Sequence, residues 1–184
     1  MKRIVLVFGL ISGAITSIMM FLTMPLIQRG TVNFDNGEVV GYTSILLSFL
    51  VLFPAIRSYR ENVGGGTITF GRAFSVGILI TVISCLFYVA SWQVISHTMW
   101  PNFADNYAAH VTAKARARGA SAEEMAKTQK EMQDMKKMLA DPVKSAAMIF
   151  LEPFPVGLIV TLVASGILRK RDDAIGSPLP ERVA

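Results

Sequence analysis

The sequence predicts an all-α, polytopic integral membrane protein with four transmembrane helices and an extracytoplasmic helical hairpin between spans 3 and 4. Three observations support this fold class. The 184 residues are 52% hydrophobic and only 17% charged, whereas soluble domains carry roughly 25% charged residues. The charges are nearly absent from four long apolar segments, and about 20 apolar residues cross a bilayer as a helix. A polar, alanine-rich segment, residues 96–145, separates the last two.

The first two spans are predicted at about residues 4–27 and 39–56. The first follows Lys2 and Arg3, but it is longer than the roughly 7–15 apolar residues of a signal peptide. We therefore expect an uncleaved transmembrane helix. The second has 18 residues, near the lower limit for a spanning helix.

The third and fourth spans are predicted at about residues 73–95 and 146–168. The third ends among aromatic residues, which gather at membrane–water interfaces. Asp141 and Pro142 precede the fourth, and these residue types favour an N-cap and a first helical position. Pro142 is therefore expected to open the helix that contains the fourth span.

Small residues recur at four-residue spacing in three of the spans. This spacing places them in one stripe on a helix, where they let a neighbouring helix approach closely. We predict these packing stripes at Gly9, Gly13 and Ser17, at Gly77, Thr81 and Cys85, and at Gly157, Thr161 and Ser165.

The inserted hairpin is predicted at residues 101–141. Gly119 is suited to end its first helix, and the pattern from Ser121 to Glu124 is a capping box that starts the second. The second helix carries an apolar interaction face. Three alternatives are open for this face: packing on the first helix, lying on the membrane surface, or docking a partner. The face consists of Met125, Met132, Met135 and Leu139.

Glu152 lies inside the fourth span, where an acidic side chain is costly and is a functional candidate. Pro153 and Pro155 follow it and are expected to distort the helix, because they cannot donate backbone hydrogen bonds. One interpretation is a proton or cation site. The other is a structural acid that is wet, paired with a loop lysine, or hydrogen-bonded within the bundle. The candidate polar intramembrane site comprises Glu152, Gln93, Thr16 and Ser84.

Basic residues flank the spans on one side, which by the positive-inside rule places both termini in the cytoplasm and residues 96–145 outside. We expect a bacterial inner-membrane location, one membrane domain over residues 1–171, and a disordered cytoplasmic tail over residues 172–184. Because the basic residues adjoin the spans and form no single basic face, a nucleic-acid partner is not expected.

Several short motifs also resemble a known family, the bacterial membrane proteins catalogued as domain of unknown function 4199. The resemblance implies a small inner-membrane protein and supplies no activity. The motifs are Arg57-Ser-Tyr-Arg-Glu61, Ile68-Thr-Phe-Gly-Arg-Ala-Phe74, Ala117-Arg-Gly-Ala-Ser-Ala-Glu-Glu124 and Leu151-Glu-Pro-Phe-Pro-Val-Gly157.

The function expected from the sequence is non-enzymatic. No nucleophile–base set, paired carboxylates or metal-ligand spacing occurs, so no catalytic residue, metal or cofactor is predicted. The leading hypothesis is a role in envelope interaction or assembly, with the lipid bilayer and a second copy or another membrane protein as partners. The alternative is a transporter or proton- or cation-coupled translocation through the polar site around Glu152.

Overall fold

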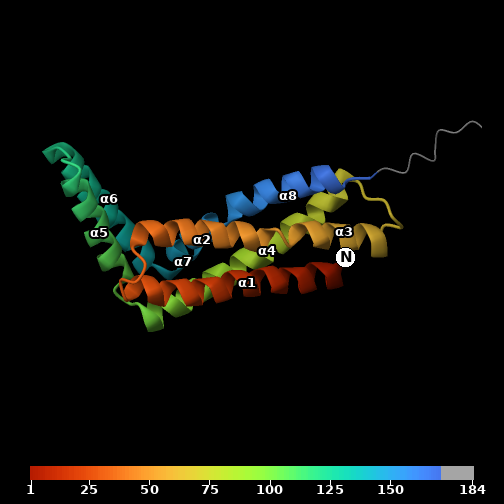
Figure 1. Cartoon of the computed structure of the whole chain (residues 1–184), viewed down its shortest axis with the longest axis horizontal. Helices are drawn as coiled ribbons and strands as arrows, with labels where there is room; N and C mark the ends of the chain where they lie inside the picture. Colours follow the sequence, from red (N-terminus) through yellow and green to blue (C-terminus); the bar gives the residue numbers. More distant parts are fainter. Residues whose placement is uncertain (171–184) are drawn as a thin grey trace, which may run out of the picture.

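The computed structural model describes residues 1–170, and each element named there is a helix. The long helices run side by side along one axis (Figure 1). The elements are α1 (Lys2–Gln28), α2 (Phe34–Phe49), α3 (Leu52–Asn62), α4 (Phe70–Val94), the π-helical turn η1 (Ile95–Met99), α5 (Phe103–Ala117), α6 (Ala122–Ala140), α7 (Pro142–Leu151) and α8 (Phe154–Leu168). The predicted tail, 172–184, lies outside the described residues.

Four helical segments are long and apolar enough to cross a membrane: α1, α2 with α3, α4 with η1, and α7 with α8. Their outward faces carry large apolar side chains; Leu22 is 61% and Ile167 66% exposed. Such surfaces suit lipid rather than water. The helices therefore indicate a multi-pass membrane protein, and the prediction of an all-helical chain with four spans is confirmed.

The second span is longer than predicted. It runs over 29 residues, Phe34–Asn62, and not over 39–56. Its start was missed because the Asn33 side chain caps the helix, accepting a hydrogen bond from the Asn36 N–H at 2.7 Å. Its end was missed because charged residues continue the helix as an i,i+4 pair. Arg57 Nε lies 2.8 Å from Glu61 Oε1.

Two of the four spans are interrupted. The second breaks at Leu50 and Val51, between α2 and α3. Pro54 follows the break and has no N–H to donate to the Leu50 carbonyl. The Phe53 N–H donates to that carbonyl instead, at 3.2 Å, in a tighter turn. The fourth breaks at Glu152 and Pro153, between α7 and α8.

The stripe of α1 packs against α4. A Cβ added at Gly9 would lie 2.9 Å from Ile83 Cγ2, and one at Gly13 would lie 2.6 Å from Phe87 Cγ. The Ser17 hydroxyl accepts a hydrogen bond from Ser91 at 2.7 Å. These contacts need small residues on α1, so this stripe is used within the chain.

The stripes of α4 and α8 pack against each other. A Cβ on Gly77 would lie 2.7 Å from Thr161 Cγ2, and one on Gly157 would overlap Thr81. The hydroxyls of Thr81 and Thr161 are 3.1 Å apart. Helix α4 thus contacts both α1 and α8 through small residues, and Cys85 and Ser165 of the same stripes are fully buried.

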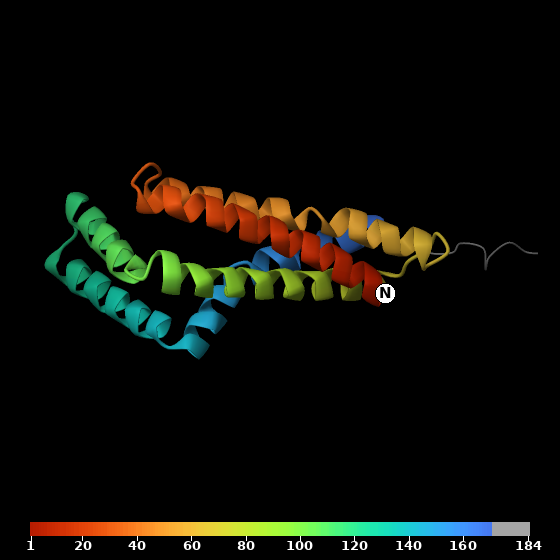
Figure 2. The same ribbon diagram turned by 90° about the horizontal axis from the view of Figure 1, so that it is seen from below.

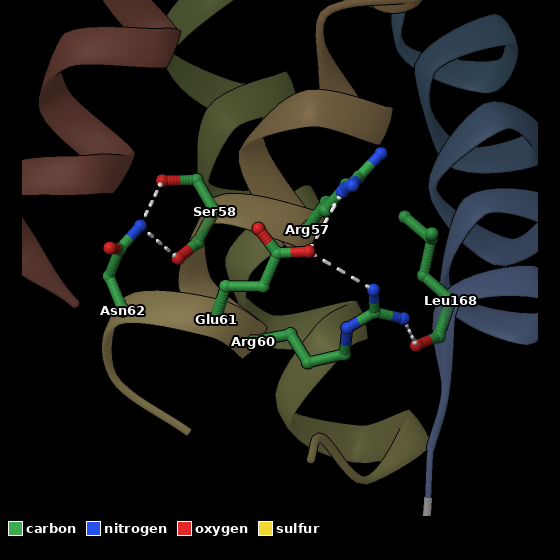
Figure 3. A network of polar contacts seen from close by, with 6 residues as sticks. All are labelled: Arg57, Ser58, Arg60, Glu61, Asn62 and Leu168. Atoms are coloured by element: carbon green, nitrogen blue, oxygen red, sulfur yellow. Dashed lines mark hydrogen bonds and ion pairs between the residues drawn. The ribbon is translucent and has the colours of Figure 1, made fainter. Parts of the chain in front are cut away.

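A polar network lies where α3 and α8 end (Figure 3). The Arg60 guanidinium donates to the Leu168 carbonyl at 3.4 Å and also contacts Glu61. The backbones of Ile68 and Lys170 exchange two hydrogen bonds of 2.9 and 3.0 Å. The α3–α4 loop is thereby joined to the end of α8.

Helices α5 and α6 lie at the opposite end from the N-terminus and contact each other (Figure 2). Gly119 has a positive φ of 76° between them, and the capping box of Ser121 and Glu124 is present. Lys136 Nζ of α6 lies 2.6 Å from Asp105 Oδ1 of α5. The face of Met125, Met132, Met135 and Leu139 is half-buried, so part of it is already covered within the chain.

Candidate functional site

A cavity of about 280 Å³ lies between the spanning helices and α5–α6, and we call it the Glu152 cavity. Six aromatic rings, three methionines and two glutamates contribute to its wall. It is lined by Met24, Ile27, Phe34, Gly37, Glu38, Gly41, Tyr42, Tyr88, Trp92, Phe103, Tyr107, Met135, Leu139, Met148, Ile149 and Glu152.

The break between α7 and α8 places Glu152 on this cavity. Helix α7 starts at Pro142, with Asp141 accepting hydrogen bonds from the N–H groups of Val143 and Lys144. It stops at Leu151, because Pro153 cannot continue the backbone ladder. Glu152 is therefore partly buried in the bundle, with the Tyr88 side chain on the same cavity wall.

Glu38 is the second carboxylate of the cavity, and it is absent from the predicted site because the second span was predicted to begin only at about residue 39. Glu38 lies four residues after the start of α2, roughly 6 Å along the helix axis. Glu38 and Tyr42 are both exposed on α2, so they form the mouth of the cavity, whereas Glu152 lies further in. The signal that could have found Glu38 is its i,i+4 spacing to Tyr42, with Gly37 and Gly41 beside them.

Among residues 1–170, no basic side chain lines the Glu152 cavity. The lysines of α5, α6 and α7 that have aspartate partners are engaged elsewhere. Lys114 lies 2.6 Å from Asp35, Lys136 lies 2.6 Å from Asp105, and Lys144 lies 3.2 Å from Asp141. The proposed pairing of Glu152 with a loop lysine is therefore not what the structure shows.

A cluster of aromatic rings covers the cavity at the α5 end. Phe103 packs edge-on against Trp92 at 4.7 Å between ring centroids and stacks on Tyr107 at 5.9 Å. Phe34 contacts the same rings from α2. Outside the rings, Asp35 bonds to Lys114 and lies 3.4 Å from His110 Nε2. These contacts hold α5 against the start of α2.

Thr16 and Ser84 lie in a different polar group, the serine cluster of Ser12, Thr16, Ser48 and Ser84. The Ser12 hydroxyl lies 3.0 Å from the Ser48 carbonyl oxygen and 3.1 Å from Ser84 Oγ. Thr16 donates to the Ser12 carbonyl at 2.9 Å. The Ser48 carbonyl is near the α2–α3 break, which explains why a hydroxyl from α1 satisfies it.

A smaller cavity of about 30 Å³ lies between the serine cluster and the Glu152 cavity. Thr16, Ser44 and Tyr88 contribute to its wall, and Tyr88 also lines the larger cavity. A water occupies about 30 Å³ of liquid. Because Tyr88 lines both cavities, the serine cluster and the Glu152 cavity are neighbours. Thr16 and Ser84, two of the predicted partners of Glu152, therefore lie one cavity away from it.

Gln93 does not line either cavity. The backbone carbonyl oxygen of Gln93 lies 2.8 Å from Nδ1 of His97, which belongs to the π-helical turn. Gln93 follows Tyr88 by five positions, which turns its side chain away on the helix, and Trp92 faces the cavity instead. Grouping Gln93 with Glu152 is thus corrected.

Two other possible functional sites are weaker candidates than the Glu152 cavity. Between residues 1 and 170, no three His, Cys, Asp or Glu side chains come together to hold a metal ion. A groove of about 400 Å³ between α5 and α6 is larger than the Glu152 cavity, but its Asp105 and Lys136 already pair with each other. The Glu152 cavity is the better candidate because its carboxylates have no basic partner on the wall that residues 1–170 form.

Comparison with known proteins gives one family. A family model matches residues 7–170, and its description is "Protein of unknown function (DUF4199)". No curated protein matches the chain, and no solved structure matches it. The geometry of the chain itself is therefore the basis for any function.

Proposed function

Since this chain belongs to the DUF4199 family of proteins of unknown function, we propose a function from the Glu152 cavity. The chain is a non-enzymatic integral membrane protein that binds a cation at Glu152 and Glu38 and translocates it. The observation that carries this proposal is a pair of carboxylates in one cavity on whose wall the described residues place no basic side chain.

The energetics of a buried acid favour this function. An ionised carboxylate away from water is costly unless a proton or a cation neutralises it. Three lysines of α5, α6 and α7 already form ion pairs with aspartates: Lys114, Lys136 and Lys144. Glu152 is thus free to take a proton or cation from outside the chain, which a site for uptake and release requires.

The interrupted spans support movement of the bound cation. Discontinuous helices form the binding sites of many transporters, because their broken ends supply polar backbone groups and points of bending. Glu152 stands at one break, and the serine cluster adjoins the other. Toward α3 the interior is closed by Phe49, Leu52 and Ile56, which are at most 1% exposed. Passage therefore needs a change at the breaks.

Flux through vesicles tests the proposal. The purified chain is reconstituted, and the uptake of H⁺, Na⁺ and K⁺ is followed with internal dyes. Glu152→Gln keeps the size of the side chain and removes its charge, so we expect the flux to be abolished. Glu123→Gln is the matched control, because Glu123 is exposed on α6 away from the cavity.

The same experiment can overturn the proposal. Circular dichroism and gel filtration establish whether Glu152→Gln still folds. A well-folded Glu152→Gln variant that conducts as well as wild type removes Glu152 from the function. If the wild-type chain conducts none of the three ions, the proposal that it translocates them is wrong.

The location and topology are also proposals: a bacterial inner membrane, with both termini in the cytoplasm and α5–α6 outside. Helix α3, which carries Arg57 and Arg60, and the start of α4, which carries Arg72, lie at the same end of the bundle as the N-terminus (Figure 1), and this supports the orientation by the positive-inside rule. A cysteine placed at exposed Ala126 should react with an impermeant reagent added from outside, since Cys85 is buried.

Assembly with a second copy or with another membrane protein is the second proposal. The supporting observation is the α5–α6 end, which leaves Met138 42% and Val143 78% exposed. The packing stripes do not support it, because the chain uses them internally. Photocrosslinking from Val143 in native membranes should yield a dimer or a heterocomplex, and finding monomer alone would argue against assembly through this surface.

A further inference from the structure

We infer that the Glu152 cavity selects a lipophilic organic monocation, such as an aromatic quaternary ammonium compound, over inorganic ions. The inference rests on the proposed cation site at Glu152 and names the class of cation. Four properties of the cavity lead to it: the aromatic wall, the charge balance, the volume and the position of the mouth.

The wall of the cavity is suited to the body of an organic cation. Cations bind to the faces of Trp, Tyr and Phe, and aromatic cages recognise quaternary ammonium groups in this way. Tyr42, Tyr88, Trp92 and Tyr107 line the cavity, together with Met24, Met135 and Met148. Methionine is polarisable and adapts its shape to apolar ligands. A small hydrated ion would leave this apolar surface unused.

The charges of the cavity are suited to a positive ligand. Glu38 stands at the mouth and Glu152 further in, and the wall, as far as the structure describes the chain, carries no basic side chain. The mouth carboxylate raises the local concentration of cations, and the inner one neutralises the bound charge in a region of low dielectric. An anion would meet two unfavourable charges, and a neutral molecule would gain nothing from either carboxylate.

The size and position of the cavity restrict the ligand further. About 280 Å³ is at the small end of ligand sites, so roughly a dozen non-hydrogen atoms fit. Glu38 and Tyr42 lie within about 12 Å of the start of α2, at 1.5 Å per residue. That level corresponds to the membrane interface, where amphipathic molecules with an apolar body and a charged end accumulate.

Ligand binding to the full-length chain in lipid nanodiscs tests the inference. The probe is benzyltrimethylammonium, followed by the fluorescence of Trp92, which lines the cavity. The matched control ligand is neopentylbenzene, which replaces the charged nitrogen by carbon. We expect the charged probe to bind at least about tenfold more tightly than the neutral one, because Glu152 interacts with charge alone.

Variants locate the binding. Glu152→Gln should weaken binding of the charged probe by about tenfold or more, and Glu38→Gln by about threefold because it is exposed. Tyr42→Leu should weaken it by about threefold through the lost cation–π contact. Tyr42 is 46% exposed, so this variant tests the aromatic wall without disturbing the core. Glu123→Gln should bind as wild type does.

The outcomes separate this inference from the proposed function. Equal binding of neopentylbenzene and benzyltrimethylammonium, or unchanged binding by Glu152→Gln, overturns the inference. A Glu152-dependent flux of H⁺ or Na⁺ without binding of benzyltrimethylammonium also overturns it, while the cation site stands. Binding that depends on Glu152 without any flux supports the inference and contradicts the proposed translocation.

Discussion

Gly157 offers the sharpest test of how the bundle is held together. It lies on α8 where α4 and α2 come closest, and a Cβ there would overlap Thr81 Cγ2 and lie 2.7 Å from Phe49 Cζ. Phe49 is 1% exposed, so its ring has little room to move aside. We predict that Gly157→Ala destabilises the bundle by forcing α8 away from both neighbours.

The size of the effect follows from a comparison on the same helix. Extra methyl groups in a packed core cost about 1–3 kcal/mol, whereas Gly→Ala in a helix gains up to about 1 kcal/mol in propensity. A Cβ on Gly166 meets nothing within 4 Å, so Gly166→Ala carries the propensity gain alone. The difference between the two variants is therefore about 1–3 kcal/mol, or roughly 5- to 150-fold in the folding equilibrium.

Unfolding in mixed detergent micelles, followed by tryptophan fluorescence, measures this difference. Thr81→Ser removes the Cγ2 methyl that a new Cβ would strike and keeps the hydroxyl that contacts Thr161. It should restore part of the stability lost in Gly157→Ala. Equal stability of Gly157→Ala and Gly166→Ala would refute the close packing of α8 on α4.

The remaining predictions concern the serine cluster and α6. Ser12→Ala removes a donor with two buried acceptors and should lower the free energy of unfolding by about 0.5–1.5 kcal/mol in the same assay. Ser75 is exposed on α4, so Ser75→Ala should change this free energy little. Equal effects of the two substitutions would contradict a buried network. The backbone N–H of Ser121 holds the pKa of Glu124 below its ordinary value of 4.5. A lowered folded-state pKa gives stability that is present above the unfolded value and is lost as the pH falls through the folded value. After correction for the intrinsic pH dependence of exchange, the protection factors of the amides at the start of α6 should therefore fall as the pH is lowered, and this fall should be absent in Glu124→Gln.

The number and place of the spans follow from the sequence because lipid imposes them directly. About 20 apolar residues without charges form a helix wherever they occur in a bilayer. The capping box at Ser121 and the helix start at Pro142 were also predictable, since a cap depends on residues a few positions apart. Local chemistry was sufficient in each case.

The ends of the second span and the composition of the site depend on contacts that a single sequence does not display. Apolar length places the end of that span at Ile56, but the ion pair of Arg57 with Glu61 extends the helix to Asn62. Glu38 lies 114 positions before Glu152, and the two share a cavity only because the fold brings α2 and the break between α7 and α8 to the same place.

The central position of α4 has a consequence for how the chain is made. Helix α4 is the third span to leave the ribosome; it packs Ile83 and Phe87 against the glycines of α1, and its own Gly77 receives Thr161 of α8. Until α4 enters the bilayer, the glycines of α1 lack the Ile83 and Phe87 side chains that they pack against, although α1 already contacts α2 and α3. The α8 stripe arrives last and closes on Gly77 and Thr81. The α4 surface around Gly77 and Thr81 is therefore covered only once the fourth span has entered the bilayer.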